Sequence, residues 1–229
     1  MVDPYRLPSD VVPSAYELVL EPDLGAATFV GEVTIIVEVV EPTAEVVLNA
    51  IDLQLDEASV GGHPAVVTLD ADHGRATLRL DEALAVGPTS VHVRFRGTLN
   101  DKLRGFYRST FTDSTGTEHT IATTQFESTD ARRAFPCWDE PALKATFSVT
   151  LVVPEGLTAV SNAAVVKDEP TDDGRRRVVF EPTMKMSTYL VAFIVGPLAT
   201  TDAVDVDGVP LRVIAPPERI ALALSLIHI

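Results

Sequence analysis

The amino-acid sequence predicts an all-β fold, an antiparallel β-sandwich with the shape of a saddle. Apolar and polar residues alternate over several short segments, which is the pattern of half-buried strands. Turn signals separate these segments, and sixteen prolines oppose long helices. The chain has 229 residues, of which 46% are hydrophobic and 22% charged, so it can form a core without disulfides or a structural metal.

The clearest strand pattern lies between residues 32 and 39, where Val33, Ile35, Val37 and Val39 share one face. The same alternation returns over residues 75–80, 91–96 and 147–151. The polar faces of these segments must meet water, as in antiparallel sheets with one covered face. Short turn signals lie between the segments: Gly61-Gly62, Asp72-His73-Gly74, Gly87-Pro88, Thr115-Gly116 and Asp172-Asp173-Gly174.

Residues 190–195 are apolar at every position, and this predicts a strand that is covered on both faces. A buried helix is the alternative at this length. Gly196-Pro197 ends the segment. Weak helical patterns occur only near residues 130–135 and after Pro217.

Residues 1–217 are predicted to form a single β domain, because no repeat or low-complexity linker divides them. Residues 218–223 are then a truncated linker or the start of a next domain. Residues 224–229 resemble the translated end of a sequencing-library adaptor and are interpreted as a readthrough scar. The alternative is an ordinary apolar segment that is cut short.

The chain is acidic, with 33 Asp and Glu residues, 18 Lys and Arg residues and a net charge of -15. Such a surface repels phosphate backbones and anionic lipids, so neither nucleic acid nor a membrane is an expected partner. The cluster Arg175-Arg176-Arg177 follows an acidic turn and is predicted to be a charged turn rather than a binding patch. We expect a cytoplasmic location, because no export signal or spanning segment is found and the one cysteine, Cys137, cannot form an internal disulfide.

The densest group of polar residues lies between Thr123 and Pro141 and predicts an ordered loop. Within it Cys137 is a possible nucleophile with His119 as its base, although a buried small side chain is the more common role of such a cysteine. Glu127, Asp139 and Glu140 offer a carboxylate pair of the glycosidase kind, but such pairs are common in acidic chains.

A catalytic zinc site of the His-Glu-x-x-His type is not encoded in this chain. The five histidines are instead expected to lie at the surface or in turns: His63, His73, His92, His119 and His228. The residues alone therefore specify no reaction.

Several motifs nevertheless resemble one known family. They are Leu7-Pro8, Val12-Pro13, Tyr16, Leu48-Asn49-Ala50, Leu99 to Lys102, Gly105 to Ser109, Thr124 to Glu127, Trp138 to Pro141 and Met186 to Phe193. Over residues 5–217 the sequence resembles the amino-terminal domain of the M1 zinc aminopeptidases, particularly the puromycin-sensitive type.

The resemblance implies a saddle-shaped β domain that caps a thermolysin-like catalytic domain. Enzymes of this family remove single residues from the amino termini of peptides, with Zn²⁺ activating a water molecule, a Glu acting as base and a Tyr stabilising the oxyanion. The motifs that supply these groups lie beyond this sequence, so we expect no zinc ligand and no catalytic residue here, and no peptide hydrolysis by the chain alone. The implied partners are peptide amino termini and the missing catalytic domain, against which an apolar face of this domain would pack.

Two substrate-binding residues follow from the resemblance. Glu127 matches the residue that binds the free α-amino group of the substrate, and Gln125 matches a residue that lines the first side-chain pocket. From spacing alone, Glu127 could instead pair with Arg132 or Arg133. The resemblance also implies a cis peptide bond between Glu127 and Ser128.

The neighbouring polar residues are predicted to hold the loop rather than to bind substrate; they are Asp130, Arg132, Arg133, Trp138, Asp139 and Glu140. An alternative function for the whole chain is a stand-alone, non-catalytic β-sandwich that binds a protein or peptide. A stop codon after Ile229 in the source DNA would favour that alternative, and a continuing reading frame would favour the enzyme fragment.

Overall fold

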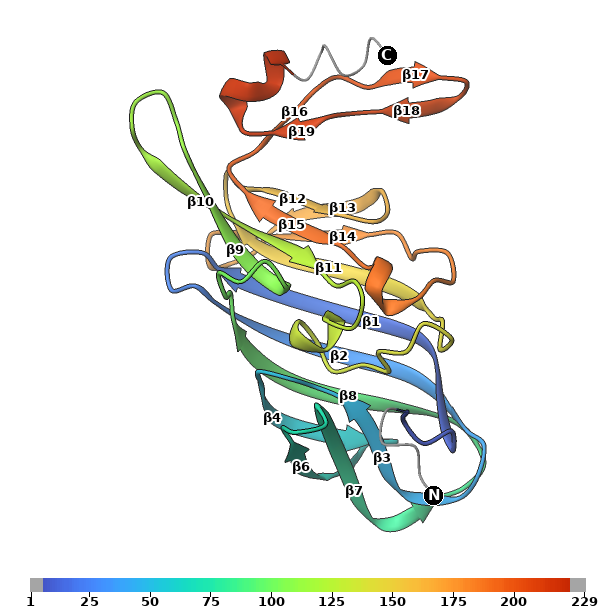
Figure 1. Cartoon of the computed structure of the whole chain (residues 1–229). Helices are drawn as coiled ribbons and strands as arrows, with labels where there is room; N and C mark the ends of the chain where they lie inside the picture. Colours follow the sequence, from blue (N-terminus) through green and yellow to red (C-terminus); the bar gives the residue numbers. More distant parts are fainter. Residues whose placement is uncertain (1–5, 223–229) are drawn as a thin grey trace.

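The computed structural model describes residues 6–222 and confirms the all-β fold (Figure 1). Strands account for nearly all of the regular structure. The helices among the described residues are short 3-10 turns, the last of which continues as helix to residue 222: η1 (Ala131–Arg133), η2 (Thr188–Leu190) and η3 (Pro217–Arg219). The weak helical pattern near residues 130–135 therefore corresponds to the single turn η1, and the pattern after Pro217 is helical to residue 222, where the described residues end.

The largest sheet has eight strands in the order β13-β14-β11-β1-β2-β8-β4-β5. Its long central strands cross the whole molecule in Figure 1. The bounds are β1 (Val11–Asp23), β2 (Thr28–Val39), β4 (Leu53–Val60), β5 (His63–Pro64), β8 (Gly87–Thr98), β11 (Thr146–Pro154), β13 (Val165–Pro170) and β14 (Arg175–Phe180).

One pair in this sheet is parallel, which the alternation of residues did not predict. β1 and β11 run in the same direction, and Tyr16 lies beside Phe147. The other neighbouring strands of the large sheet are antiparallel. A parallel pair needs a long connection, and here most of the chain separates the two strands.

Two smaller sheets pack beside the large one, with strand orders β12-β15-β10-β9 and β3-β7-β6. Two short two-stranded sheets lie near the C-terminal end of the described chain: β16-β19 and the hairpin β17-β18, which is inserted between β16 and β19 in the sequence (Figure 1). The bounds are β3 (Thr43–Asn49), β6 (Val66–Asp70), β7 (Arg75–Leu84), β9 (Gly105–Thr112), β10 (Glu118–Gln125), β12 (Thr158–Ser161), β15 (Phe193–Gly196), β16 (Ala199–Thr200), β17 (Val204–Val206), β18 (Val209–Leu211) and β19 (Ile214–Ala215).

The predicted alternation is confirmed in each of the four segments. In β2, β7, β8 and β11 the apolar face is buried: Val33, Ile35, Val37, Val39, Ala76, Leu78, Leu80, Val91, Val93, Phe95, Phe147, Val149 and Leu151. The intervening residues are half-buried or exposed, apart from Val152 near the end of β11, which is buried. The hydrophobic period of two thus determined which face of each strand joins the core.

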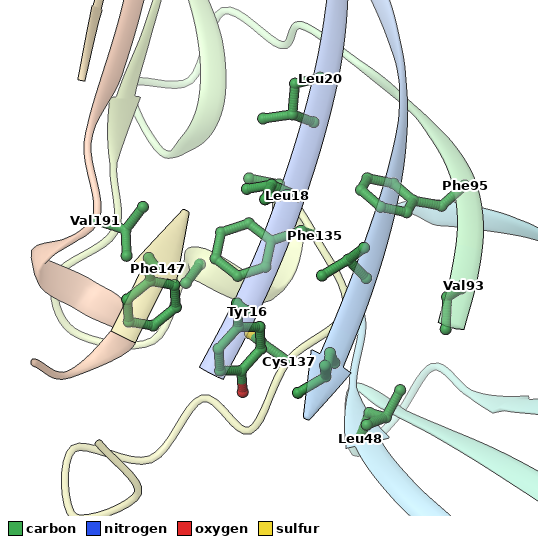
Figure 2. Packing of buried hydrophobic residues seen from close by; sticks show 14 of the residues in the cluster. Tyr16, Leu18, Leu20, Leu48, Val93, Phe95, Phe135, Cys137, Phe147 and Val191 are labelled. Carbon is green, nitrogen blue, oxygen red and sulfur yellow. The ribbon is translucent and has the colours of Figure 1, made fainter. Parts of the chain in front are cut away.

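The core lies between the large sheet and the elements that cover it (Figure 2). Tyr16 stacks on Phe147 with ring centroids 4.7 Å apart, and Phe135 meets Tyr16 edge to face at 6.2 Å. Phe135 and Cys137 come from the segment between β10 and β11, so this irregular segment packs directly on β1.

The prediction of a two-sided strand at residues 190–195 is wrong in part. β15 begins only at Phe193, because residues 188–190 form η2, and Leu190 is half exposed. Asn162 explains the delay: its side chain donates to the Leu190 carbonyl at 2.8 Å and accepts from the Ala192 amide at 2.7 Å. These bonds occupy backbone groups that a longer strand would have used.

Two turn predictions are also corrected. Arg175-Arg176-Arg177 forms the first half of β14 rather than a turn, since Asp172-Asp173-Gly174 alone makes the reversal. Gly87-Pro88 opens strand β8, and proline is tolerated there because residues 87–89 pair with a strand on one side only, β2. Arg175 pairs with Glu21 at 2.7 Å and Arg176 with Asp168 at 3.3 Å, so these two cations are neutralised locally.

The β17-β18 hairpin carries exposed aliphatic side chains on both strands: Val204, Val206, Val209 and Leu211. No helix among residues 6–222 is long and apolar enough to cross a membrane. The scar predicted at residues 224–229 lies outside the described residues, and the domain boundary at residue 217 remains a prediction.

Candidate functional site

The segment from Phe126 to Pro141, called the Glu127 loop below, leaves β10 and returns across the face of the large sheet (Figure 1). Its first residue is anchored by aromatic contacts, because the buried Phe126 ring lies 6.1 Å from Phe135 and 5.8 Å from Phe193. The Asp130 amide donates to the Phe126 carbonyl at 2.9 Å, which closes a tight turn around Glu127. The loop is therefore ordered, as its composition predicts.

Asn49, the last residue of β3, holds the far end of the loop. Its backbone exchanges two hydrogen bonds with Cys137, at 2.8 and 3.1 Å. Its side-chain oxygen accepts from the Asp139 amide at 3.1 Å, and its side-chain nitrogen donates to the Gly74 carbonyl at 3.3 Å. A buried amide with these partners leaves little conformational freedom to residues 137–139.

Asp139 is a buried carboxylate, with 2% of the residue exposed, and it connects the loop to itself and to η2. One oxygen accepts from Arg132 Nε at 2.9 Å and from the Arg132 amide at 3.3 Å. The other accepts from the Thr188 hydroxyl at 2.7 Å. These donors occupy both carboxylate oxygens, so the buried side chain has no unsatisfied acceptor.

Three other charged residues of the loop also have protein partners: Asp130, Arg133 and Glu140. Arg133 Nε bonds Asp130 at 2.7 Å, and the other side of its guanidinium bonds Asp52. A carboxylate oxygen of Glu140 accepts from the Leu7 amide at 2.6 Å. These contacts match the supporting role predicted for this group of residues.

Glu127 differs from its neighbours because its side chain is exposed and has no hydrogen bond or ion pair with any residue between 6 and 222. The alternative pairing with Arg132 or Arg133 is not formed, since those cations are taken by Asp139, Asp130 and Asp52. The peptide bond between Glu127 and Ser128 is cis, in agreement with the resemblance. The structure thus presents one unpaired carboxylate on a loop that is otherwise fixed.

Gln125 lies at the end of β10 and is also exposed. Its side-chain nitrogen donates to the Glu127 carbonyl at 3.5 Å, a long hydrogen bond that places the two candidate residues side by side. The contact involves the Glu127 backbone and leaves its carboxylate free. Such a carboxylate can accept charge-assisted hydrogen bonds from an ammonium group.

Cys137 is fully buried, and this burial, with a smaller contribution from Asp139, raises the pKa of its thiol well above the ordinary value. The thiol therefore stays protonated at neutral pH and is a poor nucleophile. We expect Ellman's reagent to modify native Cys137 on the order of 100-fold more slowly than the unfolded chain, because access requires opening of the core. Rapid modification without denaturant would contradict this environment.

The histidines do not gather into a site. His73 bonds Asp70 at 2.7 Å and His119 bonds Asp113 at 2.8 Å, while His92 contacts the Thr34 hydroxyl at 3.1 Å. His228 lies outside the described residues. Among residues 6–222 no three His, Cys, Asp or Glu side chains are close enough together to hold a metal ion, so this part of the chain does not fit a zinc centre.

Sequence reasoning gave no role to Asn49 and Thr188, although both belong to motifs that carried the resemblance. For Asn49 the only available signal was a polar residue between the apolar Leu48 and Ala50, whereas Thr188 lies between Ser187 and Tyr189 and gave no such signal. A buried polar side chain in such a position needs specific partners, but its identity does not reveal which ones.

Comparison with known proteins adds an independent finding. The family model described as the peptidase M1 N-terminal domain matches residues 12–190. The chain is 44% identical over 220 residues to aminopeptidase M1-A of Oryza sativa subsp. japonica, with 91% of this chain and 24% of the relative covered. It is 42% identical over 221 residues to the puromycin-sensitive aminopeptidase of Caenorhabditis elegans, with 93% and 23% covered. The chain thus spans about a quarter of the length of these curated relatives.

Proposed function

This chain belongs to the peptidase M1 N-terminal domain family, and from that membership we propose that it is the substrate-binding domain of a zinc metallo-aminopeptidase, an enzyme that removes single amino-terminal residues from peptides. Glu127 binds the free α-amino group of the peptide, and Gln125 borders the first side chain. The zinc ion and the catalytic residues belong to the part of the enzyme that this chain lacks. Peptide amino termini and that catalytic part are the partners.

The observation that carries the proposal is the unpaired carboxylate of Glu127. An exposed glutamate is ordinary on a flexible surface, but here Phe126 is buried and Asp130 is fixed by Arg133, so the chain on both sides is held. Because the backbone is held, only the side-chain torsions of Glu127 lose conformational entropy when its carboxylate binds a cation. An ammonium group gives the carboxylate a charge-assisted hydrogen bond, whereas the uncharged N–H inside a peptide gives a weaker one.

Two further observations support the proposal that a catalytic domain accompanies this domain in the enzyme. The relatives are about four times as long as the segment that they share with this chain. The exposed aliphatic residues of β17 and β18 form an apolar surface of the kind that packs against another domain.

The test compares two ligands, trialanine and its N-acetylated form, in titrations of the 229-residue chain followed by NMR. We expect tighter binding of trialanine by about 10-fold to 100-fold, because a charge-assisted hydrogen bond contributes about 1.5–3 kcal/mol. Glu127→Gln keeps the shape of the side chain and removes its charge, so the preference should disappear.

Glu118→Gln is the matched control, because Glu118 is an exposed glutamate on β10, at the opposite end of the strand from Gln125. Removal of the Glu118 charge should leave the preference for trialanine over N-acetyl-trialanine unchanged. Equal binding of the two peptides by the unmodified chain would refute the role of Glu127. Release of an aminoacyl chromophore by the chain with added zinc is expected to stay at background.

A further inference from the structure

Residues 186–193, called the clamp segment below, contact both ends of the Glu127 loop. At the far end, the Ser187 hydroxyl donates to the Pro141 carbonyl at 2.7 Å, and the Thr188 hydroxyl donates to the Asp139 carboxylate at 2.7 Å. Ser187 and Thr188 are 3% and 1% exposed. The bond between Thr188 and Asp139 is buried, so water does not readily replace a partner that is lost there.

At the near end, Phe193 of the clamp segment holds the chain just before Glu127. Its amide donates to the Thr124 hydroxyl at 3.2 Å, and its ring lies 5.8 Å from the Phe126 ring. The clamp segment thus contacts Phe126, directly before Glu127, and also Asp139 and Pro141 at the other end of the loop. Movement of the clamp segment would shift both supports together.

Thr188 is the point where the clamp segment reaches the hydrogen bonds inside the loop. Its hydroxyl fixes one Asp139 oxygen, and the other oxygen holds Arg132 through its side chain and its amide. Arg132 belongs to η1, whose first turn follows directly on Asp130. A hydroxyl at residue 188 is therefore connected to the turn that carries Glu127 through one buried carboxylate.

We propose that Thr188 is a positioning residue for Glu127: by orienting the Asp139 carboxylate, it holds the loop in the form that binds a peptide ammonium group. The functional part of this inference rests on the proposed role of Glu127. Thr188 itself does not touch the peptide. Its contribution is geometric, since it lowers the number of conformations that the loop samples before binding.

The experiment uses the 229-residue chain and the variants Thr188→Val and Thr188→Ser. Valine matches the shape of threonine but has no hydroxyl, and serine restores the donor. Thr158→Val is the matched control, because it removes another partly buried hydroxyl, which donates to the Leu198 carbonyl at 2.6 Å. Thr188→Ala replaces the valine variant if circular dichroism shows that valine does not fit.

Two measurements are made on each variant. Amide hydrogen exchange of Asp130, whose N–H bonds the Phe126 carbonyl, reports on the turn around Glu127. The ¹³C shift of the Glu127 carboxyl carbon reports on the surroundings of the side chain itself. Titration with trialanine and N-acetyl-trialanine then measures binding.

In Thr188→Val we expect Asp130 exchange to become about threefold to tenfold faster, the range that the loss of one hydrogen bond produces. The Glu127 carboxyl shift should change and trialanine affinity should fall by a similar factor. Thr188→Ser should restore all three readouts, and Thr158→Val should alter none.

Unchanged exchange and an unchanged Glu127 shift in Thr188→Val would overturn the inference, as would a folded serine variant that restores neither. Equal affinity of the unmodified chain for the two peptides would instead refute the proposed function. In that case the exchange and the carboxyl shift still decide whether Thr188 positions Glu127.

Discussion

Arg132→Met is expected to lower the free energy of unfolding by about 3–5 kcal/mol, because it leaves the Asp139 carboxylate buried without its cation. Methionine retains much of the length of arginine, so the loss reflects charge and hydrogen bonds more than volume. The variant removes the 2.9 Å bond from Arg132 Nε to Asp139 and a second, 3.1 Å bond to the Asp139 carbonyl. Urea unfolding followed by fluorescence measures the change, since the one tryptophan, Trp138, adjoins Asp139.

Arg79→Met is the control for this variant. Arg79 pairs with Glu45 at 2.6 Å, but both side chains are largely exposed, so the expected loss is at most about 1 kcal/mol. Combining Arg132→Met with Asp139→Asn should recover at least about 1 kcal/mol of the loss, because the unpaired charge is then absent. If Arg132→Met alone is as stable as Arg79→Met, the ion pair between Arg132 and Asp139 does not hold the loop.

Trp138→Ala is expected to lower the free energy of unfolding by about 3–5 kcal/mol, the usual effect of removing a large aromatic side chain from a core. Trp138 is among the largest fully buried side chains, with 1% exposed. Its amide donates to the Tyr16 hydroxyl at 3.1 Å, and that backbone bond remains in the variant. The loss therefore measures the packing of the indole ring alone.

The midpoint of thermal unfolding of Trp138→Ala should fall by about 6–20 °C for a chain of this size. Circular dichroism is the appropriate measurement, because the variant has no tryptophan fluorescence. Leu103→Ala removes an apolar side chain that is 64% exposed and should change stability by no more than about 0.5 kcal/mol. If the two alanine variants have the same midpoint, the anchoring role assigned to Trp138 is incorrect.

If both variants behave as expected, the Arg132–Asp139 pair and the Trp138 ring each make a large contribution to the stability of the fold that holds the Glu127 loop. The proposed binding by Glu127 can then be tested separately, because its carboxylate takes no part in these contacts. A domain can in this way keep an anion free at its surface, while the cost of ordering the loop is offset by folding.

The sequence alone predicted the faces of the strands, because a period of two residues is a local property that sheet geometry preserves. Val33 and Phe147 could be assigned to the core without knowing which strands they neighbour. Local patterns were less reliable where side chains from elsewhere intervene, as at Leu190 and Ala192, whose backbone groups bond Asn162. Motif resemblance supplied the family, which the family model over residues 12–190 supports.

Only the tertiary structure decided which charges of the Glu127 loop are paired. Spacing placed Arg132 and Arg133 within reach of Glu127, but Asp52 and Thr188, which are far away in the sequence, complete a different set of partners. Hydrogen bonds and ion pairs depend on distances of a few ångströms between side chains, and the order of residues does not fix those distances. The sequence therefore predicts that this polar loop is ordered, whereas only the fold leaves the carboxylate of Glu127 without a partner among the described residues.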